Sequence, residues 1–245
     1  MAKQRLDLVL VERGLAASRE QARAAVEAAR VLVSGRPAVK PAMLVSDGTA
    51  IELLAPPRYV SRGGEKLEHA LRRFAIGVGG LVVADIGAST GGFTDCLLQH
   101  GAARVYAIDV GYGQIDYRLR TDPRVIVMER VNARYLEPLP EPVDLAVADL
   151  SFISLTKVLP AVAVSLKPGA QLVVLLKPQF EARREEVGRG GIVRDPLVHA
   201  AVVGRFVHWL TSQGYRILGF TLSPIRGASG NREFLMHLQP PDAAA

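Results

Sequence analysis

Four charged residues that lie far apart along the chain are of the types an enzyme needs to activate a weakly acidic hydroxyl group. They are Lys66, Asp149, Lys177 and Glu233. A lysine can stabilise the negative charge that develops on an oxygen, and flanking carboxylates can hold that lysine in position. Taken one at a time, each of the four also fits an ordinary salt bridge. Their meaning therefore depends on whether the fold brings them together.

The predicted strands give a reason to expect that it does. Asp149 and Lys177 each end an apolar segment, and Glu233 begins another. The carboxyl ends of parallel strands meet at one edge of a sheet, so Asp149 and Lys177 should point into the same crevice. Lys66 lies beside the apolar face of a predicted helix, and we expect it at the rim of the core.

The segment Asp85-Ile86-Gly87-Ala88-Ser89-Thr90-Gly91-Gly92-Phe93 has the composition of a ligand-binding turn. It follows a predicted strand and opens a helix at about Phe93. Its glycines let the backbone approach a ligand closely, and a helix N-terminus offers free N–H groups. Asp109, which ends the next strand, can accept both ribose hydroxyls of a nucleoside. The segment predicts a nucleoside cofactor, although a dinucleotide site would usually show the spacing G-x-G-x-x-G.

Apolar segments alternate with helix-length segments through the rest of the chain. This alternation predicts an α/β fold of the Rossmann-like, doubly wound kind, with a mostly parallel sheet covered on both faces. The last two strands follow a helix expected over 195–213 and are joined by a Gly/Pro/Ser-rich turn, so the last strand should pair antiparallel. The strands are expected over 81–85, 105–109, 125–129, 145–149, 171–177, 216–222 and 233–238.

The front of the chain predicts a small, separate α+β unit. A short helix should end near Gly14, and Ser18, with Gln21 three residues later, marks the start of a second helix. Short strands are expected over 31–34, 38–40 and 50–54. If the second helix reaches Arg30, then Arg19, Arg23 and Arg30 lie within about 40° of one another around it.

Charge is concentrated in this front part. The net charge is +6, and residues 1–73 hold 13 Lys/Arg against 8 Asp/Glu while the rest is nearly neutral. A basic front on a neutral body predicts a polyanionic partner.

Cys96 is the only cysteine, which excludes a disulfide framework, and the five histidines show no metal-ligand spacing, so we expect no metal. The sequence contains no apolar run of about 20 residues and no signal-peptide pattern, which favours a cytoplasmic protein.

Residues 5–53 resemble the small RNA-binding domain named after ribosomal protein S-four, although that family usually has a glycine where this chain has Ala29-Arg30. The resemblance implies an RNA-binding domain over 1–57, a linker over 58–65 and a catalytic domain over 66–245. The basic residues expected to contact RNA are Lys3, Arg5, Arg19, Arg23, Arg30, Arg36, Lys40, Arg58 and Arg62.

The pattern D-x-G-x-x-x-G-G from Asp85 to Gly92 resembles the first motif of class I S-adenosylmethionine methyltransferases. The resemblance implies that S-adenosylmethionine is the cofactor, with Asp85 facing its amino group and the helix N-terminus holding its carboxylate. Asn132 stands where relatives often carry an aspartate for the adenine. The residues expected to bind the cofactor are Asp85, Gly87, Ala88, Ser89, Gly91, Gly92, Phe93, Asp109 and Asn132.

The four charged residues resemble the Lys-Asp-Lys-Glu tetrad of the FtsJ-like ribose 2'-O-methyltransferases. With the segments VGYGQ, VADLSFISL, LLKPQFE and SGNREFL in this order, the chain resembles the TlyA, or hemolysin A, family of ribosomal RNA cytidine-2'-O-methyltransferases. By that resemblance Lys177 activates the hydroxyl, Asp149 and Lys66 orient it, and Glu233 anchors the lysines. Large-subunit RNA is the expected substrate, since the chain lacks the C-terminal tail of longer members that also act on the small subunit.

Three other functions stay open at this point. The chain could be a non-catalytic RNA-binding or ribosome-assembly factor, a membrane-acting haemolysin, or a methyltransferase for a protein or small molecule. An intact tetrad argues against the first, the absence of a membrane-spanning or basic amphipathic segment against the second, and the basic front unit against the third. We expect ribosomal RNA or a ribosomal subunit as the partner, no need for a membrane, and a monomer on RNA.

Overall fold

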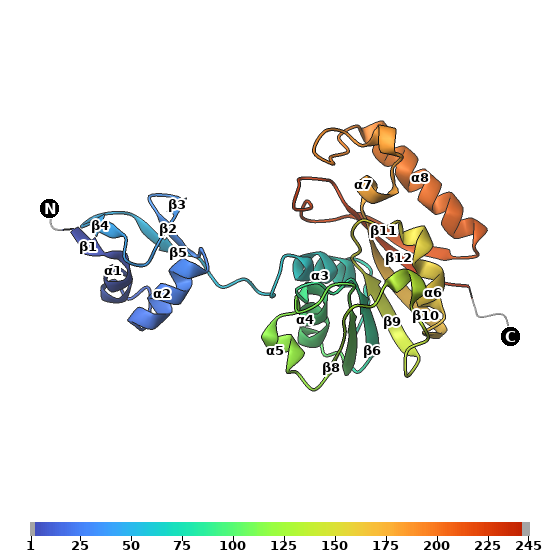
Figure 1. The fold of residues 1–245 in the computed structure, drawn as a ribbon, viewed down its shortest axis with the longest axis horizontal. Helices are drawn as coiled ribbons and strands as arrows, with labels where there is room; N and C mark the ends of the chain where they lie inside the picture. The colour runs from blue at the N-terminus through green and yellow to red at the C-terminus, as the bar shows by residue number, and fades with distance from the viewer. Residues whose placement is uncertain (1–2, 242–245) are drawn as a thin grey trace. The chain divides into compact units, whose positions relative to one another are not determined.

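The computed structural model describes residues 3–241 (Figure 1). The chain forms two compact units, and the boundary falls between Arg58 and Tyr59. Each unit has its own hydrophobic core. Among the described residues, no helix is both long enough and apolar enough to cross a bilayer.

The first unit is built from two helices and short strands around a small aliphatic core. Leu6, Leu10, Val26 and Val31 are its most buried large side chains. The hydroxyl of Ser18 accepts a hydrogen bond from the Gln21 N–H at 3.2 Å and so caps the second helix. The elements are β1 (Lys3–Arg5), α1 (Leu6–Glu12), α2 (Arg19–Glu27), β2 (Val31–Val33), β3 (Arg36–Pro37), β4 (Leu44–Ser46) and β5 (Ile51–Leu53).

Two predictions for this unit are wrong. Helix α2 ends at Glu27, and Ala29 takes the left-handed conformation at φ +53°, which a glycine usually takes after a helix. Arg30 therefore lies outside the helix and does not extend the stripe of Arg19 and Arg23. Ser34 and Gly35 form a two-residue turn, with φ +49° and +76°, that places Arg36 opposite Val33. This early reversal puts the strand at 36–37 rather than at 38–40.

The second unit confirms the predicted doubly wound fold. Its seven-stranded sheet has the order β11-β12-β10-β9-β6-β7-β8, in which β12 runs antiparallel to both of its neighbours and the other pairs are parallel. The elements are α3 (Gly63–Arg73), β6 (Val82–Ile86), α4 (Gly92–Gln99), β7 (Arg104–Ile108), α5 (Tyr117–Arg120), β8 (Val125–Met128), η1 (Ala133–Tyr135), β9 (Val143–Ala148), η2 (Leu155–Lys157), α6 (Leu159–Ala163), β10 (Leu166–Leu176), α7 (Pro178–Glu181), η3 (Arg184–Glu186), α8 (Pro196–Ser212), β11 (Arg216–Leu222) and β12 (Phe234–Gln239).

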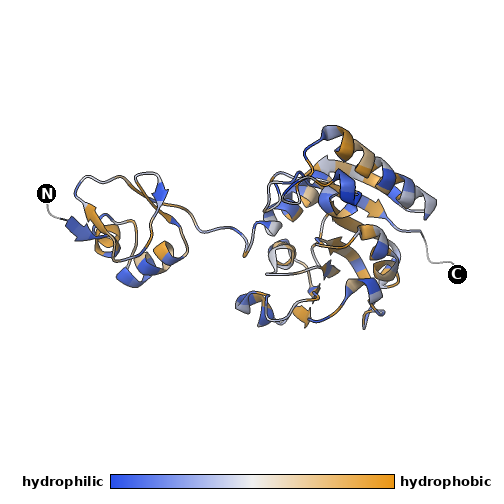
Figure 2. Ribbon diagram, turned by 45° about the horizontal axis from the view of Figure 1, so that its top comes forward, coloured by the Kyte–Doolittle hydropathy of each residue, from blue (hydrophilic) through white to orange (hydrophobic). Residues whose placement is uncertain are grey.

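Helices cover both faces of this sheet, as a mainly parallel sheet requires. Leu67 of α3 and Leu97 of α4 pack on one face, and Leu159 of α6 and Phe206 of α8 pack on the other. Figure 2 shows hydrophobic colouring along the central strands and alternating hydrophilic and hydrophobic residues along the helices. The order of strands reverses between β6 and β9, which is where ligands bind in sheets of this kind.

Residues 58–65, predicted as a linker, are mostly an ordered part of the second unit. Tyr59 is only 2% exposed, and α3 already begins at Gly63. A Cβ added at Gly64 would lie 2.2 Å from the Tyr59 ring, so the ring packs directly on the glycine backbone. The two glycines suggested a flexible linker, because the sequence alone does not distinguish glycines that make a linker flexible from glycines that permit close packing.

Candidate active site

Two pockets lie side by side at the point where the strand order reverses. The first, of about 410 Å³, contains all four members of the proposed tetrad, and we call it the Lys177 pocket. The second, of about 510 Å³, contains Asp109 and Asn132, and we call it the Asp109 pocket. Both are lined by the loops that follow β6 and β9, and they share five residues, which are Gly87, Ser89, Asp149, Ser151 and Phe152.

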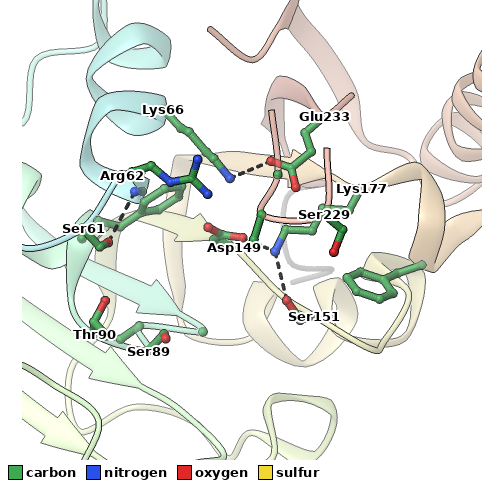
Figure 3. Close-up of a pocket in the computed structure, with 18 of the residues that line it drawn as sticks. Ser61, Arg62, Lys66, Ser89, Thr90, Asp149, Ser151, Lys177, Ser229 and Glu233 are labelled. Carbon is green, nitrogen blue, oxygen red and sulfur yellow. Dashed lines mark hydrogen bonds and ion pairs between the residues drawn. The ribbon is translucent and has the colours of Figure 1, made fainter. Parts of the chain in front are cut away.

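The tetrad forms two lysine–carboxylate pairs in the Lys177 pocket (Figure 3). The Lys177 ammonium lies 2.6 Å from Asp149 Oδ1 and donates to the Ser151 hydroxyl at 3.0 Å. The Lys66 ammonium donates to Glu233 Oε2 at 2.6 Å. The four side chains point toward one another from α3 and from the ends of β9, β10 and β12. The arrangement concentrates two cations and two carboxylates around one small space.

Lys66 is buried, and the prediction that it lies at the rim of the core was wrong. Its side chain is 9% exposed and that of Glu233 is 2% exposed. The pair is held where α3 packs beside β12, both within the second unit. A buried ammonium needs a charged partner, and Glu233 supplies it.

The loop between β11 and β12 is shaped around Glu233. A Cβ added at Gly227 would lie 2.4 Å from Glu233 Oε1, so the carboxylate rests on the backbone of that glycine. Gly227 in turn donates its N–H to the Asn231 carbonyl at 3.0 Å. The Gly/Pro/Ser-rich composition of the loop therefore serves to seat a carboxylate next to Lys66.

The Asp109 pocket carries the polar groups that a nucleoside would need. Asp109 accepts hydrogen bonds from the backbone N–H groups of Ser89 at 2.8 Å and Gly111 at 2.7 Å, which fix its carboxylate in place. Each carboxylate oxygen keeps a further lone pair for a ribose hydroxyl. Asn132 caps the turn η1 by accepting from the Arg134 N–H at 3.1 Å, which leaves its amide N–H groups for a ligand.

The glycines of the loop after β6 give close packing between protein segments rather than open space for a ligand. A Cβ at Gly87 would lie 2.6 Å from the Asp149 carbonyl oxygen, one at Gly91 would lie 2.2 Å from Leu119, and one at Gly92 would lie 2.1 Å from the Ser61 hydroxyl. Ala88, Ser89 and Phe93 line the Lys177 pocket, as does Gly92. The glycines thus bring the walls of the site together.

Gly87 offers a direct test of this packing. It has φ +86°, and a Cβ there would push against the backbone of Asp149. Gly87→Ala should therefore lower the affinity for S-adenosylmethionine roughly tenfold or more and cost about 1–3 kcal/mol of stability from backbone strain. Calorimetric titration and thermal unfolding measure the two effects. Gly80→Ala is the matched control, because Gly80 has φ +77° and no atom near a Cβ, so it should lose stability while keeping cofactor affinity.

Asp85 lies beneath the glycine loop rather than in either pocket. It is fully buried, and its Oδ2 accepts a hydrogen bond from the Thr94 hydroxyl at 2.7 Å. Its Oδ1 is buried and has no hydrogen-bond partner within residues 3–241. Burial raises the pKa of Asp85 to about 7, the charge of Asp149 adds to the effect, and the Thr94 hydrogen bond opposes it. The orphaned oxygen beneath the loop fits a cofactor that brings a cationic group, which would satisfy it.

The raised pKa of Asp85 predicts a pH dependence of stability. Between its ordinary pKa of 3.8 and its raised pKa of about 7, the folded protein binds a proton that the unfolded chain does not. The free energy of unfolding should therefore fall as pH rises from about 4 to about 7. Asp85→Asn should flatten this part of the curve, which denaturant titrations at several pH values can measure. An unchanged slope in the variant would show that Asp85 ionises normally.

Phe152 and Ser151 are residues of the site that were not predicted from the sequence, and Phe152 is the most exposed of the aromatic rings in the Lys177 pocket. It lines both pockets, its side chain is 90% exposed, and its backbone has φ +64°. Its ring lies 5.0 Å from the ring of Phe180, centroid to centroid. The loop that carries it is anchored by Glu181, which accepts from the Ser154 hydroxyl at 2.6 Å. An apolar residue after a strand-end aspartate gives no sequence signal, because exposure and backbone strain are visible only in three dimensions.

The residues predicted to contact RNA differ in the contacts that their charged groups make within the protein. Arg5 and Arg19 both pair with the buried carboxylate of Asp7, at 2.9 and 3.0 Å, and this holds the pKa of Asp7 well below its usual range. The Arg30 guanidinium donates to the Leu54 carbonyl at 2.9 Å. The side chains of Lys3, Arg23, Arg36 and Lys40 are exposed on the first unit. Arg58 is the last residue of that unit, and Arg62 lines the Lys177 pocket.

The chain is similar to known methyltransferases over both of its units. Residues 59–240 match the model of the FtsJ-like methyltransferases, and residues 4–51 match the S4 domain. A 16S/23S rRNA (cytidine-2'-O)-methyltransferase named TlyA, from Mycobacterium tuberculosis, is 49% identical over 96% of this chain and 89% of its own length. A protein named Hemolysin A, from Brachyspira hyodysenteriae, is 41% identical over 95% of this chain and 98% of its own length.

A solved structure from Streptococcus thermophilus, provisionally described as a hemolysin, has a TM-score of 0.76 at 45% identity, covering 99% of this chain and 90% of the other. Both the family match to the larger unit and these full-length similarities lead to one conclusion. The chain belongs to the family of FtsJ-like methyltransferases and carries an S4 domain in front of the catalytic unit.

Proposed function

We propose that this protein is a ribosomal RNA 2'-O-methyltransferase that transfers a methyl group from S-adenosylmethionine to the ribose 2'-hydroxyl of a cytidine. The observation that carries the proposal is the position of the Lys177–Asp149 pair on the boundary between the two pockets. Asp149 lines both pockets, and Lys177 lies 2.6 Å from it. A hydroxyl held by Lys177 would therefore meet a group presented from the Asp109 pocket.

The residues of the Lys177 pocket would have separate roles in the methyl transfer. S-adenosylmethionine would supply a methyl group on its sulfonium, so that as the oxygen attacks the methyl carbon in line the S–C bond breaks and S-adenosylhomocysteine leaves. A 2'-hydroxyl is a weak nucleophile, so Lys177, after giving one proton to solvent, would hold the hydroxyl, accept its proton and stabilise the charge that develops on the oxygen. Asp149 and Ser151 fix the Lys177 ammonium through contacts of 2.6 and 3.0 Å. The Lys66–Glu233 pair adds a second cation at the back of the same pocket.

The cofactor assignment is supported by the fit of the polar groups and by the family. Asp109 would take the ribose hydroxyls and Asn132 the adenine, while the loop 87–91 and the start of α4 would hold the methionine part. The fold is shared with S-adenosylmethionine-dependent enzymes, including a methyltransferase from Mesorhizobium loti with a TM-score of 0.54 at 18% identity. We propose S-adenosylmethionine as the only cofactor, with no metal.

The substrate assignment rests on the first unit and on the named relatives. The S4 domain carries exposed basic side chains, and the TlyA relative from Mycobacterium tuberculosis is named for both 16S and 23S RNA. A more distant TlyA from Campylobacter jejuni, 32% identical, is named for 23S RNA alone. Large-subunit RNA is common to both names, so we propose it as the substrate, bound by a monomer in the cytoplasm, where ribosomes are assembled.

Transfer of labelled methyl groups tests the proposal. The purified chain is incubated with labelled S-adenosylmethionine and, separately, with protein-free large-subunit RNA, small-subunit RNA, each isolated subunit, and bulk protein. We expect label in large-subunit RNA or in the large subunit. Label only in protein, or in none of these acceptors, would overturn the proposal. Dye release from liposomes by the same preparation, without RNA or cofactor, would instead favour a haemolysin.

Phe152 should contribute to holding the target nucleotide. A ring that is 90% exposed beside the Lys177 pocket can stack on a base, and such stacking is worth about 1–3 kcal/mol per base. Phe152→Ala should raise the KM for RNA roughly tenfold while leaving the stability unchanged. Tyr117→Ala is the matched control, because Tyr117 is 76% exposed but lines neither pocket. Equal effects of the two substitutions would remove Phe152 from this role.

A further inference from the structure

We propose that three arginines next to the active site, Arg194, Arg226 and Arg232, form a binding site for one phosphate of the RNA backbone beside the target nucleotide. The inference rests on the proposed function and adds a specific contact of the catalytic unit to the RNA. The three arginines line a separate pocket of about 330 Å³, which we call the arginine pocket.

The arginine pocket adjoins the Lys177 pocket through a single loop. Residues 223–233 connect β11 to β12, and different residues of this loop line different pockets. Gly227 and Ala228 line the Lys177 pocket, Arg226 and Gly230 line the arginine pocket, and Ser229 lines both. A strand of RNA that inserts one nucleotide into the Lys177 pocket must pass its backbone over a neighbouring rim, and this loop is such a rim.

The charges of the three arginines are not neutralised by carboxylates. Within residues 3–241, none of Arg194, Arg226 and Arg232 makes an ion pair, and Arg226 donates only to the Gly230 carbonyl at 3.0 Å. Five other arginines of the unit do pair with acids, and they are Arg104 with Glu141, Arg118 with Asp116, Arg120 with Glu129, Arg124 with Asp122 and Arg205 with Glu186. The nearby Asp195 has its carboxylate engaged in capping α8, where it accepts from the Leu197 N–H at 2.8 Å.

Two buried polar side chains, Asn231 beside the arginine pocket and His199 in its lining, fix the backbone around the pocket. Asn231 is 2% exposed, accepts from the Val193 N–H at 3.0 Å and donates to the Gly191 carbonyl at 2.9 Å. The ring of His199, which is 7% exposed, donates from Nε2 to the Val193 carbonyl at 3.0 Å. These bonds join the segment before α8 to the loop before β12, so the arginines of two distant segments face one pocket.

A phosphodiester is the ligand that this chemistry favours. Guanidinium groups bind phosphate oxygens through paired, charge-assisted hydrogen bonds, and unpaired exposed arginines keep this capacity. Phosphate contacts set the position of a nucleic acid without reading its sequence. The pocket would therefore position the strand so that the 2'-hydroxyl reaches Lys177.

The test compares the variant Arg194→Gln/Arg232→Gln with the wild-type chain. Arg226 is kept, because its bond to Gly230 supports the loop. We expect the Kd for large-subunit RNA to rise roughly tenfold, and the slope of log affinity against log salt to fall by about 0.7, the value for one phosphate of a single strand. The Kd for S-adenosylmethionine should stay unchanged, because none of the three arginines lines the Lys177 pocket or the Asp109 pocket. Arg72→Gln is the matched control, since Arg72 is exposed and lines none of the three pockets.

Ethylation of individual RNA phosphates, followed by measurement of binding, shows which phosphate contacts the arginine pocket. Ethylation of a phosphate beside the methylated cytidine should weaken binding of the wild-type chain by about the same tenfold factor and should have a much smaller effect on the double variant. If the wild-type chain methylates RNA and the double variant keeps the wild-type Kd, salt slope and interference pattern, the arginine pocket is refuted while the proposed function stands. If the wild-type chain binds RNA with this interference pattern but transfers no methyl group, the pocket is supported and the function fails. Failure of the wild-type chain to bind RNA would overturn both.

Discussion

Lys177→Ala should lower the rate of methyl transfer to RNA by about 10²–10⁴-fold, the range for loss of a group that handles a proton in the transition state. Lys177 follows β10 and is held by Asp149 at 2.6 Å and Ser151 at 3.0 Å. It does not line the Asp109 pocket. The affinity for S-adenosylmethionine should therefore remain at the wild-type level, and single-turnover kinetics with calorimetric titration separate the two effects.

Two further substitutions sharpen this result. Lys177→Arg keeps the positive charge but replaces the ammonium by a guanidinium that stays protonated, so it should also lose most activity if Lys177 exchanges a proton with the substrate. Lys167→Ala changes a lysine near the other end of the same strand, which pairs with Asp144 at 2.6 Å, and should keep full activity. Wild-type turnover by Lys177→Ala would remove this residue from the chemistry.

Glu233→Leu should destabilise the protein by about 3–5 kcal/mol, because it leaves the Lys66 ammonium buried without its partner. The two side chains are 9% and 2% exposed and lie 2.6 Å apart. Such a loss is a large part of the stability of a typical domain, which is about 5–15 kcal/mol. Denaturant titration measures the change, provided that cofactor is left out of both samples.

The double variant Lys66→Met/Glu233→Leu tests whether the unpaired charge of Lys66 causes the loss of stability in Glu233→Leu. It removes both charges and should recover most of the lost stability while remaining inactive, since apolar replacement of a buried pair is often neutral. Lys167→Met is the control for an exposed pair, with side chains 46% and 25% exposed, and should cost less than about 1 kcal/mol. A double variant as unstable as Glu233→Leu alone would show that shape, and not charge, governs the site.

The sequence allowed the fold and much of the site to be predicted because both depend on strand ends. Alternating apolar and helical segments predicted the doubly wound sheet, and the structure confirmed it. Asp149 and Lys177 were predicted to share a crevice because they end parallel strands, and they lie in one pocket. The roles of the four tetrad residues remain predictions, which the substitutions above test.

The remaining features depended on contacts and backbone conformations that the sequence pattern does not reveal. The burial of Lys66 follows from its pairing with Glu233, 167 positions away, and nothing in the local pattern around α3 indicates it. The packing of Tyr59 on Gly64 turned an expected linker into an ordered part of the catalytic unit. The left-handed conformation of Ala29 ended a helix at a residue type that rarely marks such an end.

The most direct test of the central claim is to map the methylated nucleotide by mass spectrometry. Large-subunit RNA that lacks the modification is treated with S-adenosylmethionine and either the wild-type chain or Lys177→Ala, then digested and sequenced. We predict 2'-O-methylcytidine at one position with the wild-type chain and none with the variant. A methyl group on a base, on another class of molecule, or on the same cytidine with Lys177→Ala would contradict the account.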